Sequence, residues 1–344
     1  MLGTKIGIDL GTSTVLALVE GRGVVVNEPS VIAYDTFNDK IKAIGGEAYK
    51  MLGRSPDSLT VVQPIRSGSI HDCDGVQHIL GFYVQKLCGN RILKPNVIIC
   101  VPSKVNELEK KTVLDLATAS GAARACVIEE PLAAALGAGV GTEEAMGTLV
   151  VDIGGGTTDI AVVTRGCVAE SVSVSVAGET FDEDICRFAK RERDIILGTK
   201  TAEEIKKQVG AAKLLEAELA VRAVGKDYFS KLPRSIEITS TDVFLCIREH
   251  LDFIVENIKE LLQHTAPELV ADISANGIVL TGGSARLRGI AGYIEEKTGL
   301  RTRCADNPEQ CVVKGIGVLL EDMNLLAENG YVFKSITDFQ GYEE

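Results

Sequence analysis

Two aspartates, each followed by a turn of small and hydroxylated residues, are the most chemically suggestive feature of the sequence. Asp9 and Asp152 each end an apolar run, and the turns Gly11–Thr14 and Gly154–Thr157 follow them. Turns of this composition expose several backbone N–H groups with little side-chain bulk, so they suit phosphate, and their hydroxyls add donors. The carboxylates could hold a hydrated Mg²⁺, which keeps most of its waters. Together these residues predict a site for a polyphosphate and its metal ion.

The two segments are copies of one another. A shift of 143 positions places Asp9 on Asp152 and Thr14 on Thr157, and an Arg-Gly pair further on also matches. In both copies an apolar run, a turn and a second apolar run predict a hairpin that opens one half of a duplicated chain. A single turn of this kind is most often an ordinary hairpin. The second copy and the Gly282-Gly283 turn favour a phosphate clamp with two sides.

The elements around these turns alternate between strands and helices, which indicates an α/β fold. Val97–Val101 is expected to be a buried strand, followed by a helix that Ser103 caps and Gly121 ends. Glu130 lies where a short strand gives way to a helix, with Pro131 in its first turn. The carboxyl ends of strands are where α/β sheets place their ligands, so Glu130 is a candidate site residue.

Two further helices are predicted in the second half of the chain. Thr201 and Glu204 predict a capping box for a helix over 202–209. A long amphipathic helix is indicated by apolar residues at helical spacing, namely Val243, Ile247, Leu251, Ile254, Ile258 and Leu261.

Length and composition restrict the class of protein. The 344 residues predict two domains or one divided domain, and the 45% of apolar and 24% of charged residues are typical of a soluble globular chain. The 48 acidic and 36 basic side chains leave a net charge of −12, which argues against a general nucleic-acid binder. Met1–Lys5 leads directly into an apolar strand and no apolar run approaches the roughly 18 residues of a membrane span, so we expect a cytosolic chain without a signal peptide.

The nine cysteines include no Cys-x-x-Cys pair and are expected to be mostly small buried residues in a reducing compartment.

Two other common nucleotide-binding motifs are missing from the sequence. There is no Gly-x-x-x-x-Gly-Lys-Ser/Thr, and no pair of glycines completes Gly-x-Gly-x-x-Gly after a strand. A P-loop enzyme and a simple dehydrogenase are therefore disfavoured.

Eight stretches of sequence carry a family resemblance. The paired turns are similar to the phosphate loops of the actin, sugar-kinase and heat-shock-chaperone superfamily, and the chain most resembles the MreB/Mbl family of rod-shape-determining bacterial actins. The resemblance extends from Ile6 to about Gly317 and rests on GIDLGTST, VNEPSVIAY, MLGRSP, CVPS, IEEPLAAALGAG, VVDIGGGTTDIAVV, GTKTAEEIK and GIVLTGGSARLRG.

The resemblance implies an α/β, actin-like ATPase fold in which two duplicated, ribonuclease-H-like halves surround a nucleotide cleft. The first half would be residues 1–147, with a small subdomain inserted at about 30–95. The second half would be residues 148–324, with a small subdomain at about 180–245, and residues 325–344 would form a C-terminal tail.

The resemblance also implies roles for individual residues. ATP and Mg²⁺ would bind between the halves, with Asp9 and Asp152 holding the metal ion through water. Glu130 would position the attacking water with help from Thr157, although taken alone Glu130 could also be an ordinary acid at a helix start. The nucleotide would contact the two phosphate turns, a run lining the adenosine pocket and a turn facing that run, namely Gly11, Thr12, Ser13, Thr14, Gly154, Gly155, Gly156, Thr157, Glu203, Glu204, Ile205, Lys206, Gly282, Gly283, Ser284 and Ala285.

The segment Arg91–Pro95 occupies the place where the family has a hydrophobic loop that inserts into the membrane. Ile92 and Leu93 would enter the bilayer, contributing roughly 3–6 kcal/mol, and each flanking cation would add about 1 kcal/mol near anionic lipid. A monomer would bind weakly, whereas a filament would bind by avidity. The alternative is that Ile92 and Leu93 tuck against their own domain.

Three residues depart from the family pattern. Thr14 stands where Asn is frequent, Asp159 replaces the usual Glu, and Ser284 stands where a third Gly is common. These changes leave nucleotide binding intact but bear on the subfamily and on the hydrolysis rate.

The leading hypothesis is an ATPase that polymerises head to tail into filaments at the inner face of the cell membrane and directs cell shape and wall synthesis. Its partners would be copies of itself, the membrane surface and the cell-wall elongation machinery, without nucleic acid. The alternatives are a plasmid-partitioning actin, a small-molecule kinase on the same fold and a chaperone-type ATPase. The sequence offers no substrate loop for a kinase and only about twenty residues beyond the fold for a peptide-binding domain.

Overall fold

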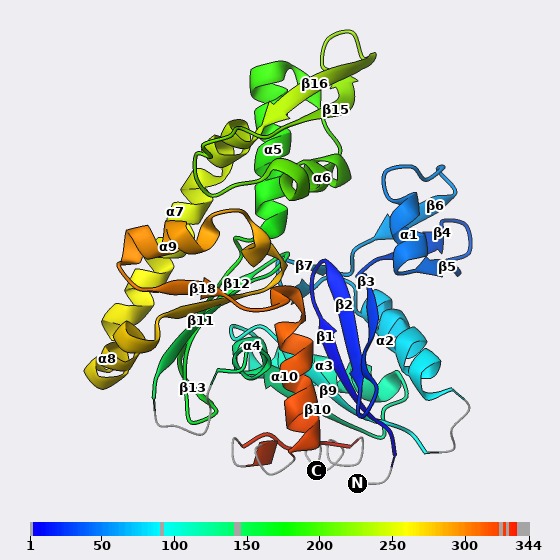
Figure 1. Ribbon diagram of the computed structural model, residues 1–344. Coiled ribbons are helices and arrows are strands. Elements are labelled where there is room, and N and C mark those ends of the chain that lie inside the picture. The colour runs from blue at the N-terminus through cyan, green and yellow to red at the C-terminus, as the bar shows by residue number, and fades with distance from the viewer. Residues whose placement is uncertain (1–2, 90–92, 141–145, 323–325, 328–329, 336–344) are drawn as a thin grey trace.

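Two five-stranded sheets with the same strand order form the centre of the molecule (Figure 1). The computed structural model describes residues 3–89, 93–140, 146–322, 326–327 and 330–335. The first sheet has the order β10-β9-β1-β2-β3, and the second has the order β18-β17-β11-β12-β13. The strands of the first sheet are β1 (Lys5–Leu10), β2 (Thr14–Val19), β3 (Gly23–Pro29), β9 (Asn96–Val101) and β10 (Arg124–Glu129); those of the second are β11 (Thr148–Ile153), β12 (Thr158–Thr164), β13 (Cys167–Val174), β17 (Ile278–Thr281) and β18 (Thr302–Cys304).

The sheets confirm the duplication that the sequence predicts. β1 pairs antiparallel with β2 and parallel with β9, and β11 pairs antiparallel with β12 and parallel with β17. Each predicted hairpin therefore lies at the same place in its own sheet. β9 and β11 are buried along their whole length because helices cover both faces of the sheets.

Helices cover the two sheets in layers. On the outer face of the first sheet lie α2 (Cys73–Cys88) and α3 (Glu107–Ala119), and on that of the second lie α7 (Ser240–His264), α8 (Pro267–Asn276) and α9 (Ile290–Thr298). The long amphipathic helix is confirmed as α7, whose six predicted apolar residues are all buried. Between the sheets lie α4 (Glu130–Gly137) and α10 (Cys311–Glu321), packed against each other in one apolar core.

The two central helices each pack on the sheet of the opposite half. α10 follows β18 in the chain but contacts β1, β2, β3 and β9, whereas α4 follows β10 and contacts β11, β12 and β13 in addition to its own strands. A Cβ at Gly137 would overlap the Cys311 carbonyl, and one at Gly315 would overlap the Ala133 carbonyl, so glycine permits the close approach of the two helices. The sequence boundary near residue 148 therefore does not coincide with the spatial division of the core.

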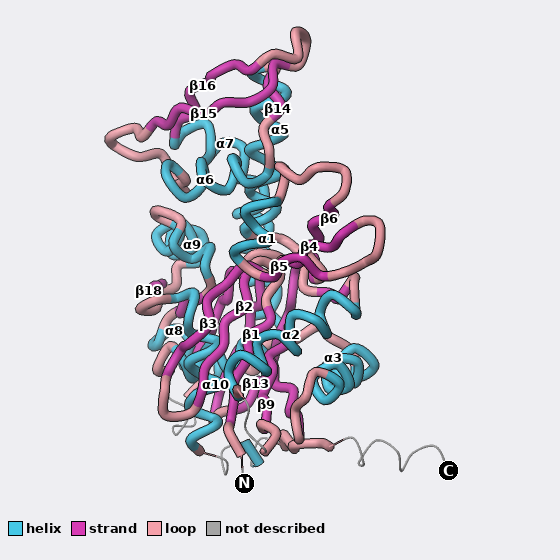
Figure 2. The backbone as a smooth tube through the Cα atoms, turned by 90° about the vertical axis from the view of Figure 1, so that its right-hand side faces the viewer, coloured by secondary structure: helices cyan, strands magenta, loops and turns pink. Residues whose placement is uncertain are grey.

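Each half also carries a small lobe, and Figure 2 shows the first sheet in the lower part of the molecule with both lobes above it. The first lobe contains β4 (Ile32–Asp35), β5 (Ile41–Ile44), α1 (Gly46–Met51) and β6 (Leu59–Val62). The second contains α5 (Gly178–Arg193), β14 (Ile195–Ile196), α6 (Thr199–Val209), β15 (Ala220–Asp227) and β16 (Pro233–Thr239). A short hairpin, β7 (Ile65–Arg66) and β8 (Ser69–Ile70), connects the first lobe to α2.

Two local predictions were wrong. Asn106, not Ser103, caps α3, because Asn106 and Glu109 form a reciprocal capping box. The capping box predicted at Thr201 is absent, since α6 already begins at Thr199 after Gly198.

The prediction that the cysteines are mostly buried holds for a minority of the nine residues, all of which lie in the described part of the chain and outside any disulfide. Cys100, Cys126 and Cys311 are buried, whereas Cys73, Cys167 and Cys304 are exposed and the other three are half-buried. Cys73 and Cys167 each stand at the first residue of their element, where the chain emerges from the core.

The end of the described chain returns to the first half. Lys334 pairs with Ala125 on the edge strand β10 through two backbone hydrogen bonds of 2.8 and 2.9 Å. Tyr331 and Phe333 pack against the core between the sheets. None of the described helices combines the length and apolar character needed to cross a bilayer.

Candidate functional site

The two duplicated turns meet face to face between the sheets. Each is closed by the same hydrogen bond, from Gly11 N–H to Thr14 O at 3.1 Å and from Gly154 N–H to Thr157 O at 2.9 Å. A Cβ at Gly155 would collide with the Ser13 hydroxyl, and in the same way one at Gly156 would collide with Thr12. The predicted phosphate residues of the two halves are therefore brought together, at a separation that only glycine allows.

The third predicted turn joins this pair. Gly283–Arg286 forms the short 3₁₀ helix η1 directly after β17, and Ser284 Oγ donates to Gly154 O at 2.7 Å. Gly282 has φ +83°, and a Cβ there would meet Ile153 O and Asp152 Oδ1. Glycine at position 282 is therefore required both by its backbone angle and by its neighbours.

The residues Glu203–Lys206, which were predicted to line an adenosine pocket, differ in their burial and in their contacts. Lys206 Nζ lies 2.6 Å from Gly178 O and 2.9 Å from Asp182 Oδ2, next to the second phosphate turn. Glu203 is half-buried and Glu204 is exposed. The Ile205 side chain, like that of Ala285, is buried in the apolar core of the second half. Within the run 203–206, the polar side chains of Glu203, Glu204 and Lys206 lie outside this core.

Four carboxyl groups lie beneath the turns: Glu130, Asp152 and Asp159 are buried, and Asp9 is half-buried. Asp9 is on β1 beside Cys100 of β9, and Asp152 is on β11 beside Thr281, whose Oγ1 donates to Asp152 Oδ1 at 3.0 Å. Burial raises the pKa of Asp9 to about 7. Burial and the charges of Asp159 and Asp9 raise the pKa of Asp152 to about 8.

Glu130 begins α4 directly after β10, as predicted, and is buried. Burial is the main cause that raises its pKa, followed by the charges of Asp159, Asp9 and Asp152. Because these like charges act on one another, the four acids lie within one electrostatic neighbourhood, where a cation would be stabilised.

Asp159 was not predicted as a site residue, although it belongs to this neighbourhood. It lies opposite Asp152 in the β11–β12 hairpin and is almost wholly buried. Its Oδ1 accepts a 3.0 Å hydrogen bond from Ser103 N–H, which opposes the effect of burial on its pKa. The hairpin register offered a signal, because a turn closed at residues 153 and 158 places residue 159 across from Asp152.

Two further neighbours of the turns come from distant segments. Gly68, in the turn between β7 and β8, donates its N–H to Thr12 Oγ1 at 3.1 Å, and a Cβ there would collide with Thr157. Glu179, at the start of α5, accepts a 3.1 Å hydrogen bond from Ser13 Oγ and donates its N–H to Gly155 O at 2.8 Å. No local pattern in the sequence indicates either contact.

The acid cluster fits a hydrated Mg²⁺ better than a dehydrated metal. Among the described residues, no three His, Cys, Asp or Glu side chains are close enough to ligate an ion directly. Mg²⁺ usually keeps several waters and touches one or two carboxylates. Asp9 and Asp152, at corresponding positions of the two halves, are the residues that could bind those waters.

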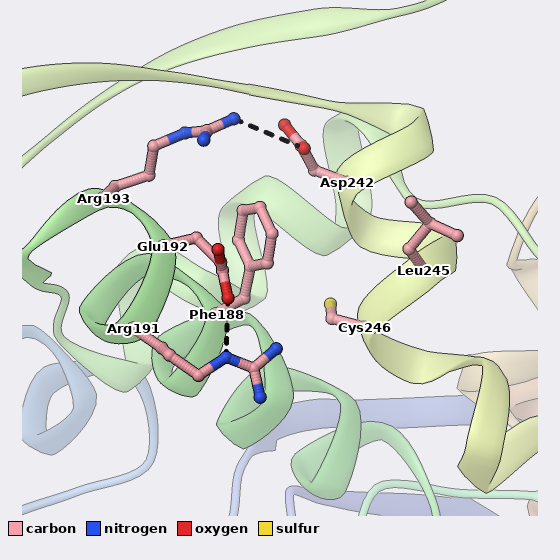
Figure 3. Close-up of a pocket in the computed structure, with 7 residues that line it drawn as sticks. All are labelled: Phe188, Arg191, Glu192, Arg193, Asp242, Leu245 and Cys246. Atoms are coloured by element: carbon pink, nitrogen blue, oxygen red, sulfur yellow. Dashed lines mark hydrogen bonds and ion pairs between the residues drawn. The ribbon is translucent and has the colours of Figure 1, made fainter.

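A cavity of about 250 Å³ lies elsewhere, between the C-terminal end of α5 and the start of α7 (Figure 3). Arg193 pairs with Asp242 across it at 3.5 Å, and Phe188 and Cys246 also line it. Phe188, the first lining residue along α5, lies roughly 13 Å along the helix axis from Glu179, because a helix rises about 1.5 Å per residue. The cavity is therefore separate from the paired turns.

The predicted membrane loop is described in part. Leu93 is 55% exposed, whereas Ile92 lies outside the described residues. The Leu93 side chain is therefore not tucked against its own domain.

Comparison with known proteins agrees with this architecture. The chain is 40% identical over 329 residues to the cell shape-determining protein Mbl of Bacillus subtilis, covering 95% of this chain and 98% of that one. It is 35% identical over 331 residues to the cell shape-determining protein MreB of Escherichia coli K12, covering 94% and 95%.

Solved structures match equally well. The crystal structure of MreB5 of Spiroplasma citri bound to AMPPNP superposes with a TM-score of 0.91 at 36% identity, covering 96% of this chain and 99% of that one. The same protein bound to ADP gives a TM-score of 0.90, with 95% and 99% covered. The fold is therefore actin-like, as the sequence resemblance implied.

A family profile described as MreB/Mbl protein matches residues 3–328. With this match and two curated relatives of 35–40% identity over nearly the whole length, the chain belongs to the MreB/Mbl family.

Proposed function

We propose that the protein binds and hydrolyses ATP with Mg²⁺ and that its subunits assemble into filaments along the inner face of the cell membrane, where they direct cell shape and wall synthesis. The observation that carries the proposal is the meeting of the two duplicated turns above the buried carboxyl groups of Glu130 and Asp152 and the half-buried one of Asp9. The MreB5 structures add support, because that protein is bound to ADP in one and to AMPPNP in the other.

The proposed chemistry depends on positioning and charge. Backbone N–H groups of both turns, with the hydroxyls of Thr12, Ser13 and Thr14, would hold the phosphates, and the bound Mg²⁺ would neutralise charge on them. Glu130, held rigidly at the start of α4, would orient the attacking water, and Thr157 would assist from the second turn. Phosphoryl transfer needs little more from the protein, since most of its barrier is lowered by orientation and electrostatic stabilisation.

The rest of the nucleotide would lie against α6 and η1. Glu203 and Lys206 offer polar atoms to the adenosine side, and Ser284 lies beside the phosphate turn. Binding would hold the two halves together, because each half supplies one phosphate turn.

Self-association requires exposed groups that a second copy can bury. Phe229 and Leu232, at the tip of the β15–β16 hairpin, are 74% and 64% exposed. They lie at the end of the molecule far from the described C-terminal segment (Figure 1). We propose that this tip enters a head-to-tail contact, which is heterologous and therefore builds an open filament.

Membrane attachment would use the loop that contains Ile92 and Leu93. One copy would bind weakly, and a filament would bind through many loops at once. The cell-wall elongation machinery would then be organised along the filament, as the family membership suggests.

Co-sedimentation with anionic liposomes, with and without Mg-ATP, tests the proposal. We expect the wild type to pellet with lipid in an ATP-dependent manner, and an Ile92→Ser/Leu93→Ser variant to form polymer whose pellet no longer contains lipid. Wild-type polymer that pellets equally with and without liposomes would instead indicate a partitioning-type actin. Absence of polymer, with ATP turnover stimulated by a small metabolite, would replace the cytoskeletal proposal by a kinase.

A further inference from the structure

Tyr49 connects the two small lobes of the molecule. Its hydroxyl, on α1 of the first lobe, donates to Glu203 Oε2 on α6 of the second lobe at 2.6 Å. Lys200, one turn earlier on α6, places its Nζ 4.2 Å from the centre of the Tyr49 ring, within the range of a cation–π interaction. The two helices are about 150 residues apart in sequence and face one another from the two upper lobes (Figure 1).

Both partners are held in place for this contact. The Tyr49 ring packs against the small apolar cluster of the first lobe, formed around Val31, Ala33 and Ala48. On the other side, Lys207 Nζ binds the second oxygen of Glu203 at 2.6 Å. Burial, together with the neighbouring Glu203, raises the pKa of Tyr49, so its hydroxyl remains a donor throughout the physiological range.

The contact is coupled mechanically to the phosphate turns. One turn along α6 from Glu203, Lys206 is bound to Gly178 O and Asp182. Gly178 N–H in turn lies 3.2 Å from Gly154 O, in the second phosphate turn. A displacement of α6 away from α1 would therefore be transmitted to the residues proposed to hold the phosphates.

We infer that Tyr49 is a positioning residue that, through Glu203, holds the two small lobes together over the adenosine side of the site and thereby slows the release of nucleotide. The inference rests on the proposed function, because Glu203 belongs to the run proposed to line the adenosine pocket. Release of the nucleotide requires α1 and α6 to separate, which breaks the Tyr49–Glu203 hydrogen bond and removes Lys200 from the ring.

The test is the dissociation rate of a fluorescent ATP analogue, chased with excess ATP in a stopped-flow instrument. For Tyr49→Phe we expect dissociation about tenfold faster than in wild type, because a hydrogen bond to a charged group contributes about 1.5 kcal/mol or more. Glu203→Ala combined with Tyr49→Phe should be no faster than Glu203→Ala alone, since both changes remove the same hydrogen bond. Tyr34→Phe is the matched control, because this buried hydroxyl of the same lobe has no hydrogen-bond partner among the described residues.

A second readout needs no nucleotide. Backbone amides of residues 46–51 and 199–207 should exchange hydrogen for deuterium faster in Tyr49→Phe than in wild type, and Tyr34→Phe should leave them unchanged. Equal dissociation rates for wild type and Tyr49→Phe would overturn the inference and leave the proposed function standing. Equal acceleration by both Phe variants would also overturn it, since that result would indicate general loosening of the lobe. A wild type that binds no nucleotide would overturn the proposed function and this inference together.

Discussion

Replacement of Asp152 by Asn should make the metal-free protein less sensitive to rising pH. The folded-state pKa of Asp152 is raised from 3.8 to about 8, because the carboxyl is buried and faces the charges of Asp159 and Asp9. Folding therefore favours the protonated, neutral form of Asp152. This contribution to stability is fully present below about pH 4 and is lost as the pH rises toward about 8, because the unfolded chain has already released the proton that the folded chain retains.

The magnitude follows from linkage. While the folded state binds one more proton than the unfolded state, the free energy of unfolding falls by about 1.4 kcal/mol for each pH unit. Between about pH 5.5 and about pH 7, Asp152 therefore lowers the free energy of unfolding of the wild type by about 2 kcal/mol. The Asp152→Asn variant does not lose this stability, because Asn does not titrate. Asn keeps the acceptor for Thr281 Oγ1, so the change removes the charge without removing the 3.0 Å hydrogen bond.

Urea unfolding followed by circular dichroism, in EDTA and without nucleotide, measures this difference at several pH values. Asp57→Asn, at an exposed position, controls for the change in net charge. Addition of Mg-ATP at about pH 8 should reverse the order of stability, because ligand binding stabilises only the protein that binds it. If the free energy of unfolding falls by the same amount in wild type and in Asp152→Asn between about pH 5.5 and about pH 7, the raised pKa of Asp152 is refuted.

Three further predictions concern the site and the surface. Gly156→Val should weaken ATP binding at least tenfold in calorimetry, because its Cβ would collide with Thr12, whereas Gly81→Ala, where nothing lies within 4 Å of the new Cβ, should bind as wild type. Glu130→Gln should slow ATP hydrolysis about 100-fold while nucleotide binding persists, and an unchanged turnover rate would remove Glu130 from the mechanism. Phe229→Asp should raise the critical concentration for polymerisation several-fold in pelleting assays, and normal assembly would exclude the β15–β16 tip from the filament contact.

The parts of the site that could be predicted from sequence are those encoded locally and repeated. Asp9, Asp152 and their turns stand out because hairpin patterns recur 143 residues apart, and Glu130 stands out because a strand, an acid and a proline follow in order. α7 was predicted for a similar reason, since its apolar face repeats with the period of a helix over about five turns, from Val243 to Leu261.

The parts that could not be predicted depend on contacts between distant segments. Gly68 approaches Thr157, and Glu179 binds Ser13, only after the two halves have come together. The error at Ser103 is one of position: α3 begins only at Glu107, so Asn106 stands at its cap, whereas Ser103 lies further back and its N–H binds Asp159 of the opposite half. The contact between Tyr49 and Glu203 was likewise beyond local reasoning, because each residue is unremarkable within its own helix.

The reciprocal packing of α4 and α10 has a consequence for biosynthesis. The sheet of the first half obtains its inner cover from α10, which ends at Glu321, so this half cannot complete its core when residue 147 leaves the ribosome. At 5–20 residues per second, synthesis of the intervening chain takes roughly 10–35 s. During that interval we expect the apolar inner faces of β1, β2 and β9 to lack their cover, which makes the nascent chain prone to aggregation until the last helix arrives.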